Sequence, residues 1–207
     1  MRQKDAASNT YKLVIGCFLL VLVLMAGASQ SSSQGRPKAE TITAVVTGTS
    51  TQAGQITTMM LLIYEFSTDD DRQILIDAFN KGQNQGLFNA LSKMKAIGRI
   101  SLTNTLGMDI SYIKMAPTPT GRKIRFVTNR TIAYGEAYAD NSNATGTFNL
   151  TGGELDLNDS DRKQSKGVLY PAAKLAIDKE GQLQIQLNQN AWQLGDIIDK
   201  RGTPGEN

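Results

Sequence analysis

The side chains with which this protein could do chemistry are carboxylates, hydroxyls, lysines, arginines and tyrosines. The 207-residue sequence has no histidine and one cysteine, Cys17, which lies in an apolar segment near the N-terminus. A Ser-His-Asp triad and an imidazole zinc site are therefore excluded. Neither a G-x-G-x-x-G nor a Walker sequence is present. Most of the common catalytic arrangements are thus missing.

Serine precedes lysine by three residues at Ser92–Lys95, Ser111–Lys114 and Ser160–Lys163. This is the spacing of nucleophile and base in penicillin-binding enzymes, but the Ser-Asp-Asn and Lys-Thr-Gly sequences of those enzymes are absent. Three occurrences in one short chain also show how readily the pattern arises. We therefore predict no catalytic residue.

One acidic segment could hold a metal ion. Its oxygen ligands would come from Asp156, Asn158, Asp159 and Asp161. Oxygen donors at alternate positions suit a hard cation such as Ca²⁺. An EF-hand loop, however, needs glycine where Asp161 stands and glutamate where Gly167 stands. We expect a polar loop without a cofactor, with Ca²⁺ binding as the alternative.

Basic residues gather around one predicted hairpin, namely Lys114, Arg122, Lys123, Arg125 and Arg130. Such a group could attract an anionic partner: a lipid head group, an acidic glycan or a protein. The alternative is an ordinary solvated face on which Tyr112 stacks on Arg125.

The elements that would position these residues begin with an apolar strand, Gln55–Phe66. Its apolar residues occupy both parities, which predicts a central strand covered on both faces. A strand at Glu40–Thr49 precedes it. Further strands are predicted at Arg99–Thr103, Met108–Met115, Arg122–Thr128, Thr147–Leu150 and Glu154–Leu157.

Two short helices are predicted between residues 68 and 97. Thr68 and the acids that follow it are typical of a helix start. Apolar residues at one-face spacing mark the two helices, at Ile74, Leu75, Ala78 and Phe79 and then at Leu87, Phe88, Leu91 and Met94. Gly82 is placed to end the first helix. Both helices are too short to be stable alone and should pack on the sheet.

Two hairpins are predicted. Around Pro117–Gly121, a tight register would place Tyr112 opposite Arg125 and Lys114 opposite Lys123 on the outer face. The second joins Leu175–Ile177 to Leu183–Leu187, with Leu183, Ile185 and Leu187 pointing inward. Beyond it, a final turn or short helix would pack its apolar side chains onto the sheet, namely Trp192, Leu194, Ile197 and Ile198.

The N-terminal segment has the features of a secretory signal peptide. A basic start, a short apolar run and Ala26-Gly27-Ala28 predict cleavage after Ala28, with retention as a membrane anchor as the alternative. Residues 29–38 form a predicted Ser/Gln-rich linker, residues 39–200 a single domain and residues 201–207 a disordered tail. Removal of residues 1–28 lowers the net charge from +3 to +1 and removes the only cysteine. So small a charge argues against nucleic-acid binding.

Three segments resemble exported bacterial proteins of unknown function: Gly98–Ser101, Thr118–Thr128 and Gly167–Leu175. The resemblance covers most of the predicted mature domain. It implies a secreted bacterial protein, periplasmic or extracellular, and carries over no activity, cofactor or site residue.

Together these features predict one α+β domain, a mainly antiparallel twisted sheet with the helix pair on one face.

We expect a secreted, non-catalytic protein that binds a partner or ligand in the cell envelope or outside the cell. One alternative is a carrier of a small apolar ligand, whose cavity flexible methionines could line: Met59, Met60, Met94, Met108 and Met115. Another is a carboxylate-based hydrolase of envelope glycans, which needs two acids across a cleft. The partner would be a protein, a glycan or an apolar ligand, and membrane contact would come only through the signal sequence before cleavage.

Overall fold

The computed structural model describes residues 39–132, 148–177, 183–188 and 190–201. The chain divides into two compact units, Met1–Arg36 and Pro37–Asn207, and every described residue belongs to the second.

Several predictions fall outside the described residues. These are the signal peptide at 1–28, the whole linker at 29–38 and the tail beyond residue 201. Within the described part, no helix combines the length and apolar character needed to cross a membrane.

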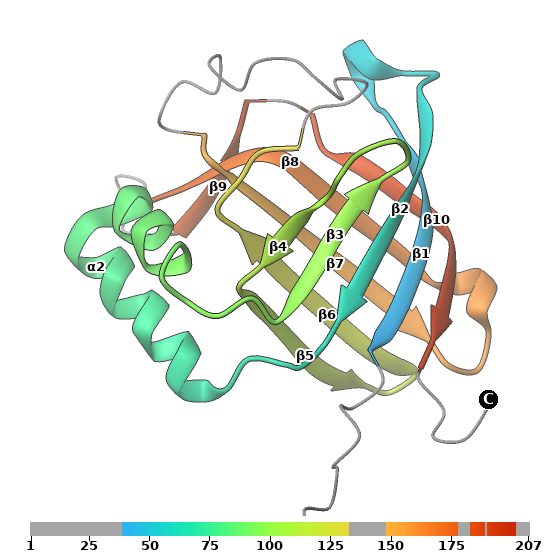
Figure 1. Cartoon of the computed structure of the whole chain (residues 1–207). Coiled ribbons are helices and arrows are strands. Elements are labelled where there is room, and N and C mark those ends of the chain that lie inside the picture. The colour runs from blue at the N-terminus through green and yellow to red at the C-terminus, as the bar shows by residue number, and fades with distance from the viewer. Residues whose placement is uncertain (1–38, 133–147, 178–182, 189, 202–207) are drawn as a thin grey trace, which may run out of the picture. The chain divides into compact units, whose positions relative to one another are not determined.

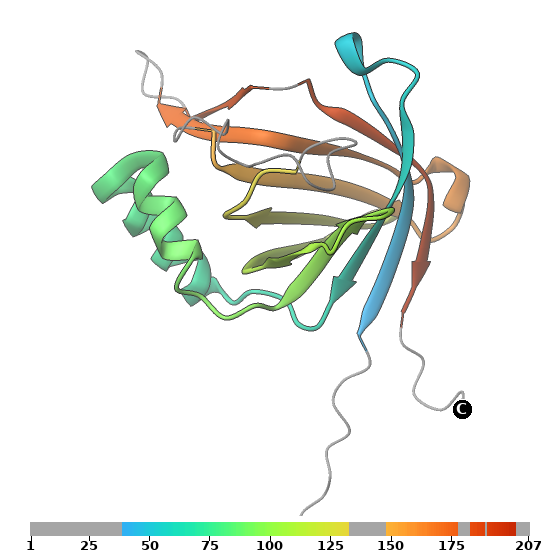
Figure 2. The ribbon, with the colours of Figure 1, turned by 45° about the horizontal axis from the view of Figure 1, so that its top comes forward.

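In the described part, ten strands form one antiparallel sheet that curves into a nearly closed barrel (Figures 1 and 2). The first five strands are β1 (Glu40–Thr47), β2 (Ile56–Ile63), β3 (Gly98–Leu102), β4 (Met108–Ile110) and β5 (Tyr112–Thr118). The other five are β6 (Gly121–Thr128), β7 (Leu150–Asn158), β8 (Lys166–Ile177), β9 (Leu183–Leu187) and β10 (Trp192–Lys200). Their order across the sheet is β4-β3-β2-β1-β10-β8-β7-β6-β5, and β9 pairs with β8.

The seam of the barrel lies between the two ends of this order, β4 and β5, which follow each other in the chain. Across the seam, the Thr128 hydroxyl donates a hydrogen bond to the Asp109 carbonyl at 2.8 Å. The segment after β2 also bonds to β5, because the Ser67 amide donates to the Ile113 carbonyl at 2.7 Å. These bonds hold the free sheet edges together.

The predicted two-helix unit on an open sheet is wrong. The described residues contain one α-helix, α2 (Asp69–Leu91), with a kink at Gly82 and Gln83, where φ is −139° and +51°. Gly82 interrupts the helix as its conformational freedom allows, but helical structure resumes two residues later. The sheet covers one of its own faces by curling, so it does not need two helices to do so.

Helix α2 begins with a capping box. The Asp71 amide donates to Thr68 Oγ1 at 3.1 Å, and the Thr68 amide donates to Asp71 Oδ2 at 2.8 Å. Beyond the kink the helix folds back closely on its first half, because a Cβ on Gly86 would lie only 2.1 Å from the Ala78 carbonyl oxygen. Two 3-10 turns, η1 (Ser50–Gln52) and η3 (Arg162–Gln164), lie in connections between strands.

Apolar side chains fill the inside of the barrel. The fully buried ones include Ile42, Met59, Leu61, Ile100, Ile110, Ile113, Ile124, Leu155, Leu169 and Trp192. They come from strands on all sides of the barrel, so the interior is a packed core.

The final turn or short helix predicted around Trp192 is wrong, because these residues form strand β10 between β1 and β8. The alternating pattern slips at Asp196, whose φ is +45°, where the β1–β10 register also shifts. The slip turns Ile197 inward and leaves Ile198 half exposed. It also brings Asp199 to the inner face.

The β5–β6 hairpin has a different register from the predicted one. Thr118 pairs with Gly121, so Lys114 lies opposite Arg125 and not opposite Lys123. The difference is two residues, which leaves every side chain on its predicted face. Ile113 and Ile124 accordingly both lie in the barrel core.

Candidate functional site: an apolar cleft on the outer face of the barrel

An apolar cleft of about 680 Å³ lies between α2 and the outer face of strands β5 to β9. Its volume falls within the usual range of small-molecule sites. The cleft is lined by Arg72, Leu75, Ile76, Phe79, Asn80, Leu87, Tyr112, Arg125, Phe126, Val127, Leu150, Gly152, Gly153, Glu154, Tyr170, Ala173, Leu175 and Ile185. Most of these side chains are aliphatic or aromatic.

The floor of the cleft is one row of residues across four strands. Tyr112 pairs with Val127, Val127 with Gly152, and Gly152 with Tyr170. Side chains alternate between the faces of a strand, so the neighbours of this row point into the barrel while the row faces α2. Gly152 has no side chain, which leaves the centre of the floor hollow.

The helical wall carries Leu75 and Leu87, both buried, together with the half-buried Phe79. Two polar contacts fix this wall to the sheet. Lys114 Nζ lies 2.7 Å from Asp69 Oδ1 in the first turn, and the Leu175 amide donates to Asn84 Oδ1 at 2.9 Å just after the kink. The helix is therefore fastened at two separate points, and the space between them stays open.

Charged groups lie at the edge of the cleft formed by β6 and β7. Glu154 accepts from Lys123 Nζ at 2.8 Å and from Arg125 Nε at 2.6 Å. Hydrogen bonds from these two cations lower the pKa of the Glu154 carboxyl below its usual value. The Glu154 carboxylate thus balances the positive charges of Lys123 and Arg125 on the outer face.

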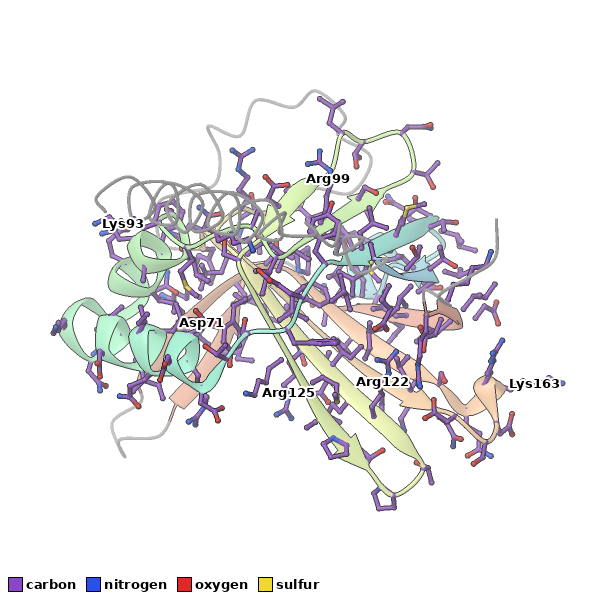
Figure 3. The ribbon with its side chains drawn as sticks, turned by 60° about the horizontal axis from the view of Figure 1, so that its bottom comes forward. Asp71, Lys93, Arg99, Arg122, Arg125 and Lys163 are labelled. Atoms are coloured by element: carbon purple, nitrogen blue, oxygen red, sulfur yellow. The ribbon has the colours of Figure 1, made fainter. Side chains whose placement is uncertain are left out.

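Arg122 lies on the opposite face of β6, inside the barrel (Figure 3). Its guanidinium bonds to both carboxylate oxygens of Glu40 and, at 2.7 Å, to Asp199 Oδ2. Burial opposes the charge of Arg122, yet the hydrogen bonds that it donates to Glu40 and Asp199 raise its pKa above the usual value. Two buried side-chain atoms of this cluster, Arg122 Nε and Asp199 Oδ1, lack a hydrogen-bond partner within the described residues.

This buried cluster has a clear structural role. Arg122 comes from β6, whereas Glu40 and Asp199 come from β1 and β10 on another wall of the barrel. The ion pairs therefore tie distant strands together at one end of the core. Glu40 and Asp199 are two acids brought close together, as a glycan hydrolase would require, but both are bound to this guanidinium.

The five basic residues predicted as an anionic-partner patch do not share one surface. Lys114, Lys123 and Arg125 lie on the outer face of β5 and β6, where each forms an ion pair. Arg130 is exposed just after β6. Arg122 is buried in the barrel and is not accessible to a partner.

The predicted metal loop between β7 and β8 is held by its own hydrogen bonds. Asn158 Oδ1 accepts from the amides of Ser160 and Asp161, and Asp161 Oδ1 accepts from the Lys163 amide. Asp159 forms an ion pair with Arg201 at 2.6 Å. No group of three acids placed to hold a metal ion occurs in the described part of the chain, and Asp156 projects from the outer face of β7 opposite Lys123.

The methionines expected to line a carrier's cavity do not line this cleft. Met59 is fully buried in the barrel core, and Met108 packs against that core. Met94 packs beside α2, while Met60 and Met115 are exposed at 43% and 38%. The cleft was missed in the sequence because its walls are built from other side chains.

One signal for the cleft was present in the β8–β9 hairpin. Ile185 was predicted to point into the core, but it is 52% exposed and lies at the rim of the cleft opposite Leu175. Tyr112 and Val127 gave a second signal. Their positions along the strands place both side chains on the outer face, where apolar residues must be covered by another element. Neither signal could place α2 as that cover.

Comparison with known proteins adds no further constraint. No family model, curated protein or solved structure matches the chain. The function must therefore be argued from the cleft.

Proposed function

We propose that this chain is a non-catalytic binding protein whose cleft between α2 and the outer sheet face holds a small apolar ligand. The observation that carries the proposal is an open space of about 680 Å³ walled by Leu75, Phe79, Val127 and Leu175. Apolar surface left in contact with water is unfavourable, so an apolar ligand that covers these walls gains free energy. The barrel interior is packed with its own side chains and leaves this outer cleft as the better site.

The proposal keeps the cellular location predicted from the sequence. The signal peptide predicted at residues 1–28 and the resemblance to exported bacterial proteins support a role in the periplasm or outside the cell. In an aqueous compartment an apolar molecule needs a carrier or a receptor, and the cleft suits either.

Gly152 provides a direct test. A Cβ at this position would meet the Phe126 carbonyl oxygen at 3.5 Å and Tyr170 Cδ2 at 3.9 Å, which are ordinary contact distances. Gly152→Leu therefore fills the cleft floor without displacing the backbone. Gly195 on β10 offers a matched control, since a Cβ there meets nothing within 4 Å and Gly195 does not line the cleft.

The experiment is a fluorescence titration with N-phenylnaphthylamine, a neutral apolar dye that brightens out of water. We expect saturable binding by the natural chain and by Gly195→Leu, and a loss of at least about tenfold in affinity in Gly152→Leu, the equivalent of about 1.4 kcal/mol. Absence of saturable binding, or equal binding by the two leucine variants, would overturn the proposal. Native mass spectrometry of gently purified protein gives an independent reading, in which co-purified small molecules are expected.

A further inference from the structure

One end of the cleft is cationic. Arg72 and Arg125 both line it, and Glu154 is the one acid among its lining residues. Glu154 already forms ion pairs with two cations, Lys123 and Arg125. The Arg72 side chain is exposed and makes no ion pair or hydrogen bond within the described residues. The nearby Asp69 carboxyl is already bound by Lys114, and its pKa is lowered mainly by Lys114 and to a lesser extent by Arg72.

The two arginines lie at the same end. Asp69, one helical turn before Arg72, is bound by Lys114 at 2.7 Å, and Lys114 is the direct strand partner of Arg125. The first turn of α2 therefore sits over this part of β5 and β6. Figure 3 shows Arg125 beside the turn of α2 that carries Asp71.

A hydrogen-bond donor lies beside them. Tyr112 lines the cleft two residues before Lys114, and its hydroxyl has no hydrogen-bond partner within the described residues. Burial raises the pKa of Tyr112, the nearby charges of Lys114 and Arg72 lower it, and those of Asp69 and Asp71 raise it further, so that the pKa lies above its usual value. The phenol is therefore protonated at neutral pH and free to donate.

The other end of the cleft is apolar. Leu175 and Ile185 form a strand pair there, on β8 and β9. Three strand spacings separate β6 from β9, and the β8 partners of the two residues, Val168 and Leu175, are seven residues apart, so Arg125 and Ile185 are roughly 25 Å apart over the sheet. The cleft thus runs from a cationic end over an apolar floor, and a ligand that matched it would have a single anionic head and an extended apolar tail.

We propose that the cleft binds single-chain alkyl carboxylates, with the carboxylate between Arg72 and Arg125 and the alkyl chain lying over Gly152 towards Ile185. This inference rests on the proposed function of the cleft as a ligand site. A guanidinium binds a carboxylate through two parallel hydrogen bonds. Arg125 gives only its Nε to Glu154, which leaves both Nη groups for the ligand. The Tyr112 hydroxyl donates a third contact.

The test compares dodecanoate with dodecanol as competitors of N-phenylnaphthylamine, because the two share a chain and differ in the charge of the head. We expect dodecanoate to compete about tenfold to a hundredfold better than dodecanol, as hydrogen bonds to a charged group allow. Arg72→Gln and Arg125→Gln should each remove most of this preference, with each competition referred to that variant's own dye affinity. Arg162→Gln in η3, which removes the same charge away from the cleft, should keep the preference.

The outcomes separate this inference from the function on which it rests. Dye binding with equal competition by the acid and the alcohol would overturn the head-group assignment and leave the apolar site intact. Retention of the preference in both arginine variants would also overturn it. Failure of the dye itself to bind saturably would overturn the proposed function instead. Tyr112→Phe, which keeps the aromatic floor, should weaken dodecanoate and leave dodecanol unaffected.

Discussion

Arg122 and Arg125 stand three residues apart on β6, and their side chains leave opposite faces of the sheet. The Arg122 side chain is 10% exposed and bonds to Glu40 and Asp199 inside the barrel. The Arg125 side chain is 66% exposed, pairs with Glu154 and lines the cleft. An odd spacing along a strand always separates two side chains in this way. Arg122 therefore holds the barrel together from the inside, whereas Arg125 lines the cleft on the outer face.

The two positions should differ sharply in their effect on stability. Arg122→Ala leaves the Glu40 and Asp199 carboxylates largely buried without their cation, which costs about 3–5 kcal/mol in the free energy of unfolding. Arg125→Ala removes an exposed ion pair, which costs about 1 kcal/mol or less. Urea unfolding followed by circular dichroism measures both. Similar losses in the two variants would show that Arg122 does not hold the walls of the barrel together.

The second stability prediction concerns Gly153, a glycine packed against an aromatic ring. Gly153 lies inside the barrel opposite Phe126, and a Cβ there would come within 2.3 Å of Phe126 Cζ. The buried ring must then move, so we expect Gly153→Ala to cost about 1–3 kcal/mol. The neighbouring Gly152→Ala adds its Cβ on the cleft side at ordinary contact distances and should be nearly neutral.

A double-mutant cycle identifies the cause of the Gly153 effect. In a Phe126→Leu background the clash is relieved, so Gly153→Ala should cost at least about 0.5 kcal/mol less than in the natural chain. Urea unfolding of the four proteins gives this coupling energy. Additive losses would mean that the strain lies elsewhere than between these two residues.

Much of the strand pattern followed from alternation, but the closure of the sheet did not. Strands β1 and β3 and the β5–β6 hairpin lie where apolar and polar residues alternate between turn residues, whereas β2 was predicted from apolar residues at both parities. Alternation says which residues share a face and not how far the sheet curls. The strand β10 was missed because the bulge at Asp196 breaks its alternation, so that Ile197 and Ile198 imitate a helical spacing.

The site was harder to predict than the fold. The spacing of Leu75, Phe79 and Leu87 identified an apolar helical face, and Tyr112 was correctly placed on the outer face of its strand. The cleft depends on Gly152 lying opposite that helix, which is a relation between segments more than sixty residues apart. The basic residues were likewise grouped because they lie near one hairpin in the sequence. Arg122, however, occupies a position of β6 whose side chain points into the barrel.

The ion pairs of Glu154 predict a pH dependence. Its pKa is lowered in the folded protein by hydrogen bonds from Lys123 and Arg125, so its stabilising effect is complete above the pKa of an unfolded glutamate. The effect is lost as the pH falls through that value and then through the folded pKa. We expect Glu154→Gln to be less stable than the natural chain at neutral pH, by about 1 kcal/mol or less for such a partly exposed group. In acid the two should converge, as urea unfolding across the pH range would measure, whereas a constant difference would contradict the assignment.

The central claim is that an apolar ligand binds outside the barrel, between α2 and the sheet. Intermolecular nuclear Overhauser effects between the ring protons of bound N-phenylnaphthylamine and the protein methyl groups test it most directly. We predict contacts to the methyls of Leu75, Val127 and Leu175, which line the cleft. Contacts to Ile42, Ile124 and Leu155 in the barrel core, or contacts to none of these methyls, would contradict the account.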